Sequence, residues 1–244
     1  MTAEQITTLS IKDIVISNFH AAAVFEKYSL DFCCRGGKTI TAACEEKKID
    51  PRSVIDELSV LDDMGFFSGL RFAEWEPDFL ITYIMQNHHS YVSKMIPILH
   101  MHTHKIASVH GTNHPELIDI AKHFETVSID MQQHMRKEEE ILFPFIKKLS
   151  EAKKTNSPQQ HSHFGSVLNP IRLMETEHEL AGDQMYAIRS LSSNYALPDD
   201  ACTTYRVTYQ ELQDFEFDLH RHVHLENNIL FPNAVKLEND LITN

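Results

Sequence analysis

The sequence predicts an all-α protein, in which a small amino-terminal helical domain precedes an up-down-up-down four-helix bundle. Apolar residues recur at helical spacing through most of the 244 residues, and no stretch shows the alternation of a strand. Four long helical stretches are joined by three short to medium connections, as is typical of bundles. The pattern His-x3-Glu-x2-Ile-Leu-Phe-Pro occurs twice, at His134 and at His222.

The amino-terminal domain is predicted to cover residues 1–67 and to contain the adjacent pair Cys33-Cys34. Paired glycines after the cysteines mark a tight turn, and Gly65 is expected to end the last helix. Capping residues, and Pro51 at a first helical position, indicate where the helices begin. Three helices are predicted, over residues 11–29 after Ser10, from about Thr39 to Lys48, and from Pro51 to about Asp63.

The bundle is predicted to cover residues 77–238, after a linker at residues 68–77. Its connections are His110 to Asn113, the polar stretch 151–165, and residues 193–200. The predicted helices span residues 77–109, residues 115 to a bend or end near Pro144, residues 167–192 and residues 201–236.

The repeated pattern has the spacing of metal ligands. On an α-helix, residues four apart are separated by about 40° and about 6 Å of rise, so they project to the same side. His134 and Glu138 therefore form one ligand pair, and His222 and Glu226 form another. Ile141, Leu142, Ile229 and Leu230 should continue the inward faces and exclude water from the site.

A dinuclear site needs further donors from the other two helices. These donors must lie at the same level along the bundle as the two His-x3-Glu pairs. His134 lies 23 residues after the turn at Gly111, and His89 lies 22 residues before it. His89 is therefore the preferred ligand on the first helix, with its neighbour His88 as the alternative.

The same count around Pro198 places His222 24 residues after the turn and His178 20 residues before it. His110 lies at a turn and falls outside the site by this test. Four imidazoles and two bridging carboxylates suit a dinuclear iron centre, although these ligand types also suit manganese. The predicted ligands are His89, His134, Glu138, His178, His222 and Glu226.

The composition excludes several other classes of protein. A net charge of −13 without clustered Lys or Arg argues against binding nucleic acid or an anionic membrane. No stretch resembles a signal peptide or a membrane span. The four cysteines do not form a disulfide framework, which favours a reducing, cytoplasmic setting.

These residues resemble the hemerythrin-like di-iron bundle. Together with Asp31-Phe-Cys-Cys-Arg-Gly-Gly in the amino-terminal domain, they are similar to the Repair of Iron Centers family of YtfE/ScdA type. The resemblance covers nearly the whole chain and includes the His88-His89 pair, Val109-His110-Gly111 and Met174-Glu-x-Glu-His178. It implies two non-haem irons, oxo- and carboxylate-bridged, and leaves a homodimer open.

The resemblance further implies repair of iron–sulfur clusters damaged by nitrosative or oxidative stress. Proteins with damaged clusters would be the partners, nitric oxide or oxygen the small ligand, and iron donation or nitric oxide reduction the activity. Oxygen-carrying hemerythrins have a second His four residues after the ligand of the third helix, where this chain has Gly182. An open coordination position favours small-molecule chemistry or iron release over oxygen carriage.

Cys33 and Cys34 are candidates for a redox or iron-transfer role, because a thiolate beside Arg35 would be reactive. Two small buried apolar residues are the competing interpretation. For the whole chain, an oxygen or redox sensor without catalysis is the alternative to a repair protein. A ferritin-like oxidase is disfavoured, since its Glu-x-x-His spacing is not the one found here.

Overall fold

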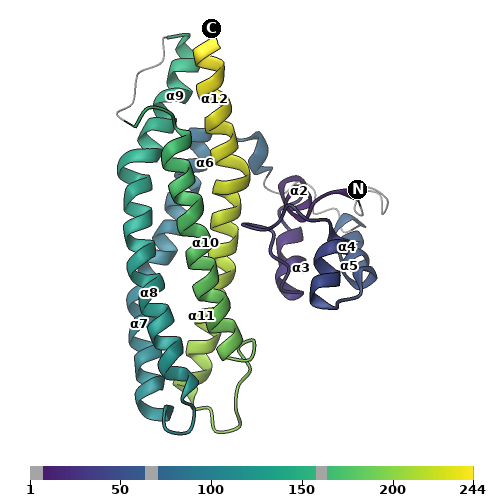
Figure 1. The fold of residues 1–244 in the computed structure, drawn as a ribbon, viewed down its shortest axis with the longest axis vertical. Helices are drawn as coiled ribbons and strands as arrows, with labels where there is room; N and C mark the ends of the chain where they lie inside the picture. The colour runs from purple at the N-terminus through teal and green to yellow at the C-terminus, as the bar shows by residue number, and fades with distance from the viewer. Residues whose placement is uncertain (1–7, 64–70, 158–163, 244) are drawn as a thin grey trace.

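The computed structural model describes residues 8–63, 71–157 and 164–243. It confirms the all-α prediction, since the described residues form helices and only one isolated β-bridge, between Ser10 and Thr39. A long four-helix bundle carries a small helical unit against its side (Figure 1). Gly65 and residues 68–70 of the predicted linker lie outside the described residues, whereas the rest of the linker is described.

Residues 8–63 of the amino-terminal unit form four helices where three were predicted. Asn18 breaks the first predicted helix with extended backbone at φ −145°. Its side-chain Oδ1 accepts a hydrogen bond from the His20 N–H, a local turn that competes with helix formation. The Ser10 and Thr39 caps form as predicted. The helices are α2 (Ile11–Ser17), α3 (Ala21–Lys27), α4 (Ile40–Lys47) and α5 (Pro51–Asp63).

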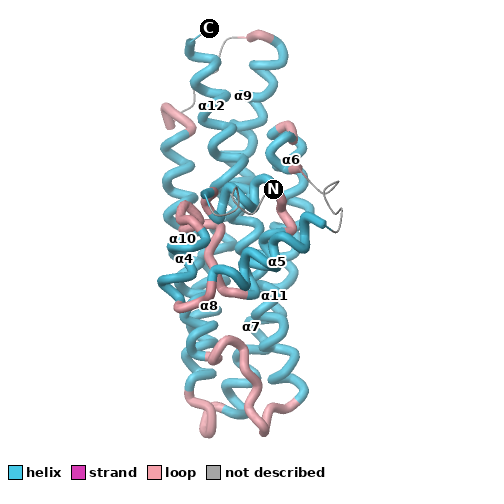
Figure 2. The backbone as a smooth tube through the Cα atoms, turned by 90° about the vertical axis from the view of Figure 1, so that its right-hand side faces the viewer, coloured by secondary structure: helices cyan, strands magenta, loops and turns pink. Residues whose placement is uncertain are grey.

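The bundle follows the predicted up-down-up-down order (Figure 2). Each long stretch packs against the next one along the chain, and the last packs against the first. A short 3-10 turn, η2 (Phe72–Glu74), precedes them. The stretches are α6 (Pro77–Ile84), η3 (Met85–His89) and α7 (Ser90–His110); α8 (Glu116–Lys137), η4 (Glu138–Leu142) and α9 (Phe143–Thr155); α10 (Leu168–Leu191); and α11 (Thr203–Leu225), η5 (Glu226–Leu230) and α12 (Phe231–Thr243).

Neither proline of the repeated pattern ends its helix. Pro144 occupies the first turn of α9, where a missing N–H costs no hydrogen bond, and α9 continues to Thr155. The predicted polar connection that was to begin at residue 151 therefore starts later. In the last stretch the helix likewise passes Pro232 and reaches Thr243, beyond the predicted end at residue 236.

Two apolar clusters fill the bundle, one on each side of its middle. The cluster toward the α7–α8 turn also includes the core of the amino-terminal unit, with Phe25 and Phe32 fully buried. The other lies among α6, α9, α10 and α12. None of the helices in the described part of the chain has the length and apolar character needed to cross a membrane.

The amino-terminal unit contacts the bundle through ion pairs and apolar packing. Glu26 on α3 pairs with Arg221 on α11 at 2.9 Å, and Arg35 pairs with Asp183 on α10 at 3.2 Å. The Phe32 ring packs edge-on against His224 on α11, with ring centroids 5.6 Å apart. The Glu26 carboxylate is buried, whereas the second ion pair is exposed to solvent and contributes little to stability.

The buried Glu26 predicts a pH-dependent stability. Burial raises its pKa to about 7, although the Arg221 guanidinium opposes the shift. The folded state then retains a proton that the unfolded chain loses near its ordinary pKa, so this contribution to the free energy of unfolding decreases as pH rises toward 7. This single group changes the free energy of unfolding by at most about 1.4 kcal/mol per pH unit. Urea unfolding from pH 5 to 7.5 should show Glu26→Gln gaining stability relative to the unaltered protein. A pH-independent difference would contradict the raised pKa.

Candidate metal centre

Three of the four long stretches change to π-helical geometry at the predicted ligands. The turn η3 ends at His89, η4 begins at Glu138, and η5 begins at Glu226. Such single π turns inside α-helices are frequent at functional sites, because they re-aim side chains without ending the helix. The fourth stretch, α10, carries His178 without a π turn.

The structure brings the six predicted ligands together in the middle of the bundle. They form two groups of four, and within each group one nitrogen or oxygen atom per residue lies within 4.8 Å of all the others. Both carboxylates belong to both groups. The first group is His89, Glu138, His222 and Glu226, and the second is His134, Glu138, His178 and Glu226.

The distances describe two adjacent groups of donor atoms, each a candidate metal position. The Nε2 atoms of His89 and His222 are 3.2 Å apart in the first, and those of His134 and His178 are 2.9 Å apart in the second. Glu226 places Oε1 3.0 Å from His222 Nε2 and Oε2 3.1 Å from His178 Nε2. A carboxylate with one oxygen toward each position has the geometry of a bridging ligand.

Glu138 reaches both positions through one oxygen. Its Oε2 lies 3.4 Å from His89 Nε2 and 3.3 Å from His134 Nε2. The two carboxylates thus approach the same pair of positions from α8–α9 and α11–α12, the two stretches that carry the repeated pattern.

All six side chains are at most 2% exposed, so their charges depend on one another. Burial would lower the pKa of His89 and of His134, but the carboxylates raise each to about 10. Burial and Glu226 would raise the pKa of Glu138, but His134 and His89 hold it at about 2. The pKa of Glu226 is likewise well below its ordinary value, because the neighbouring imidazoles outweigh burial.

The donor set fits two metal ions. Both oxygens of Glu138 and Oε2 of Glu226 are buried without a hydrogen-bond partner among the described residues. Buried carboxylate oxygens are costly unless a cation or donor satisfies them. Imidazole and carboxylate ligands without thiolate suit iron or manganese, and exclude an iron–sulfur cluster held by cysteines.

Sequence reasoning did not find the residues that orient the imidazoles. For three of the four imidazoles, Nδ1 bonds a side-chain oxygen, which turns Nε2 toward the candidate metal positions. Lys137 also pairs with Glu177. The sequence did hold a signal for them, since each residue that supplies an accepting oxygen directly neighbours a predicted ligand. The bonds are His89 to Glu139 at 2.8 Å, His134 to Glu177 at 2.9 Å, and His178 to Asn227 at 2.8 Å.

The alternative ligand His88 lies outside both groups, with its Nδ1 bonded to Asp218 at 2.9 Å. His110 lies away from the centre as expected, where its Nε2 is 3.2 Å from Cys202 Sγ. One packing expectation was wrong: Ile141 is 40% exposed, whereas Leu142 and Ile229 are buried. Ile229 holds the equivalent position in the other copy of the pattern, also within a π turn, and is buried where α2 packs against η5. The difference between the two isoleucines therefore lies in what covers each helix, which helical spacing does not reveal.

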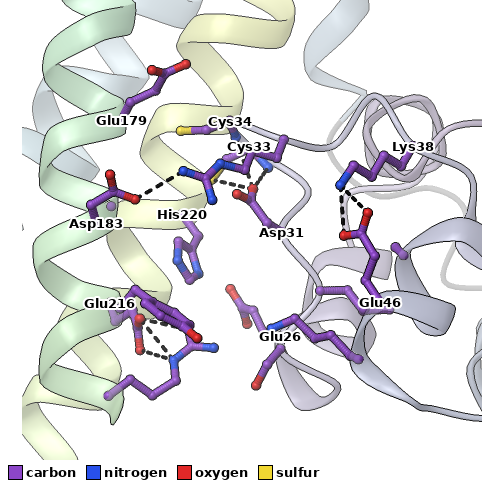
Figure 3. Close-up of a pocket in the computed structure, with 18 residues that line it drawn as sticks. Glu26, Asp31, Cys33, Cys34, Lys38, Glu46, Glu179, Asp183, Glu216 and His220 are labelled. Atoms are coloured by element: carbon purple, nitrogen blue, oxygen red, sulfur yellow. Dashed lines mark hydrogen bonds and ion pairs between the residues drawn. The ribbon is translucent and has the colours of Figure 1, made fainter. Parts of the chain in front are cut away.

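Cys33 and Cys34 line a cavity of about 300 Å³ between the amino-terminal unit and the bundle (Figure 3). Gly182, one turn after His178 on α10, lines the same cavity. Asn228 on η5 donates a hydrogen bond to the Cys33 carbonyl at 3.1 Å, which fixes the cysteine segment two residues from Glu226. Both cysteines are free thiols.

The surroundings of Cys33 work against the expected thiolate. Its pKa is raised well above the ordinary value by a hydrogen bond with Cys34, by burial, and by the Asp31 carboxylate. The Cys33 thiol donates to Asp31 Oδ1 at 3.3 Å. Arg35, which was expected to favour a thiolate, instead pairs with Asp183, and both residues line the cavity.

Two family models match the chain. Residues 80–234 match the Hemerythrin HHE cation binding domain, and residues 8–62 match the amino-terminal ScdA domain, described as a Domain of Unknown function (DUF542). The hemerythrin match contains all six residues of the candidate centre.

Curated relatives match over nearly their full length. The chain is 34% identical over 233 residues to the iron-sulfur cluster repair protein ScdA of Staphylococcus haemolyticus, covering 95% of this chain and 98% of the relative. It is 31% identical over 224 residues to the iron-sulfur cluster repair protein YtfE of Citrobacter koseri, covering 91% and 94%. A probable iron-sulfur cluster repair protein of Haemophilus influenzae is 29% identical over 231 residues, covering 92% and 96%. The chain therefore belongs to the ScdA/YtfE family of proteins with a hemerythrin-type cation-binding domain.

Proposed function

We propose that this protein repairs damaged iron–sulfur clusters, and that its centre holds two iron ions bridged by Glu138 and Glu226. The observation that carries the proposal is the sharing of both buried carboxylates by two groups of ligands. The relatives that match the whole chain are named iron-sulfur cluster repair proteins, which supports the same conclusion.

The protein residues give each metal position two imidazoles and two shared carboxylates. Iron bound there would supply a redox-active Lewis acid with coordination positions left for a small ligand. Gly182 adds no imidazole, and a side chain placed there would meet no other atom within 4 Å. A centre with few protein ligands favours release of iron to a client protein, and nitric oxide or oxygen are the small ligands of fitting size.

Iron donation predicts that label moves from this protein into a damaged cluster. The chain is loaded with ⁵⁷Fe and incubated, under reducing conditions, with a client enzyme whose four-iron cluster has lost one iron. We expect client activity to recover and ⁵⁷Fe to appear in the client's Mössbauer spectrum. His178→Ala should reduce the transfer strongly, whereas His123→Phe, on α8 and outside the centre, should not.

The same incubation distinguishes the competing activities. Recovery without ⁵⁷Fe in the client would contradict donation, and consumption of nitric oxide by the reduced, loaded protein would then favour reduction. Reversible oxygen binding with neither result would favour the sensor alternative. The double variant Cys33→Ala, Cys34→Ala tests the cysteines, since normal repair by this variant would exclude a transfer role for them.

A further inference from the structure

His222 differs from the other three imidazoles of the centre. Each of the others bonds a side-chain oxygen through Nδ1, but His222 Nδ1 has no partner among the described residues although the side chain is fully buried. An imidazole that binds metal through Nε2 carries its proton on Nδ1, so this atom is a buried donor. Leaving such a donor unsatisfied costs about 1–3 kcal/mol, which makes a missing partner improbable.

His88 has the complementary atom. Its Nδ1 lies 2.9 Å from Asp218 Oδ1, and a carboxylate there accepts the proton bonded to Nδ1. Nε2 of the same ring is then an acceptor, and it is also buried without a partner in the described part of the chain. The side chains of His88 and Asp218 are 7% and 21% exposed, so the pair connects the interior with the surface.

The two rings lie next to each other but are not directly hydrogen-bonded. Their centroids are 5.7 Å apart and their planes differ by only 10°. Neither His222 Nδ1 nor His88 Nε2 has a hydrogen-bond partner among the described residues, so these two nitrogens are not bonded to each other. One water molecule can connect them, because it accepts from one nitrogen and donates to the other. Buried waters typically satisfy otherwise unpaired polar groups in this way.

We propose that one buried water bridges His222 Nδ1 and His88 Nε2, and that His88 and Asp218 act through it as positioning residues for His222. The water accepts from His222 and donates to His88, whose Nδ1–H donates to Asp218. This series of hydrogen bonds orients the His222 ring, as Glu139, Glu177 and Asn227 orient the other three imidazoles. It assigns a role to the histidine that the sequence offered as an alternative ligand. The inference rests on the proposed metal centre, but its first test needs no repair activity.

A crystal structure of the full chain at high resolution tests the site directly. We expect one water within about 3 Å of both nitrogens, in the metal-loaded and in the metal-free protein. Two-bond ¹H–¹⁵N spectra of protein labelled in histidine should show the Nδ1–H tautomer for both rings. Absence of the water, or another group bonded to His222 Nδ1, would overturn the proposal whether or not the protein repairs clusters.

The variant His88→Phe keeps a ring beside His222 but removes the acceptor. Loss of an outer hydrogen bond to a metal-bound imidazole typically weakens metal affinity by about 10–100-fold. We expect a loss of this size at the position of His89 and His222 only, measured by chelator competition. In cobalt-loaded protein, one of the exchangeable, hyperfine-shifted imidazole N–H signals should shift or exchange faster. His88→Gln, whose carbonyl can accept from the water, should restore part of the affinity.

A merely structural role for His88 predicts a different result. Both metal positions would then weaken together, in proportion to the loss of folding stability, and no single N–H signal would change alone. His123→Phe is the matched control, because it removes a bundle histidine bonded to Gln184 at 2.7 Å. If His88→Phe does not fold, the crystal structure and the tautomers of the unaltered chain decide the question.

Discussion

Replacing Glu226 by Gln should remove both metal ions, whereas replacing His178 by Ala should remove one. Glu226 directs Oε1 toward the His222 position and Oε2 toward the His178 position, so its loss affects both groups of ligands. His178 belongs to one group only. The amide of Gln keeps the volume but not the negative charge, and a divalent cation in a site without water depends on that charge.

Metal analysis of protein loaded with excess ferrous iron and then desalted measures this difference. The unaltered chain should retain about two ions, one for each group of ligands. His178→Ala should retain about one, and Glu226→Gln well below one. Glu179→Gln is the matched control, because Glu179 neighbours His178 but is exposed. Retention of both ions by Glu226→Gln would contradict a bridging role for this carboxylate.

The sequence was sufficient to predict the six residues that the structure brings together. The repeated pattern supplied four of them, because a spacing of four residues directs two side chains to one face of a helix. Counting residues from the turns supplied His89 and His178. In antiparallel helices with a short connection, two residues that are equally far from the turn lie at the same level along the bundle. Both arguments depend on helix geometry, which is nearly independent of the surrounding sequence.

The π turns and the orienting residues could not be predicted in this way. Nothing in Glu138-Glu139-Glu140 distinguishes a π turn from an α-helix. The exposure of Ile141 depends on what packs over the outside of the helix, since Ile229 at the equivalent position is buried. The bonds of Glu177 and Asn227 join side chains from different helices, so they depend on rotamers and on how the helices pack. The break at Asn18 is a competition between a local turn and the helix, which small energy differences decide.

Replacing Arg189 by Met should destabilise the protein by about 3–5 kcal/mol, because it leaves a carboxylate buried without its cation. Arg189 on α10 binds Glu216 on α11 through two hydrogen bonds, with Nη2 2.7 Å from Oε1 and Nε 2.9 Å from Oε2. The Tyr195 hydroxyl also donates to Glu216 at 2.8 Å. The side chain of Glu216 is only 1% exposed, whereas that of Arg189 is 14% exposed.

A comparison of single and double variants separates the charge from the packing. Urea unfolding of metal-free protein at pH 7.5 should give a large loss for Arg189→Met and a much smaller one for Arg189→Met, Glu216→Leu, since replacing both members of a buried ion pair removes the unpaired charge. Lys153→Met is the control for an exposed pair, with Asp240 2.6 Å from Lys153, and should cost less than about 1 kcal/mol. Both residues of the buried pair line the cavity beside Cys33. A loss below about 1 kcal/mol for Arg189→Met would therefore mean that water in this cavity solvates Glu216, and that the interface between the amino-terminal unit and the bundle is wetter than its buried ion pairs indicate.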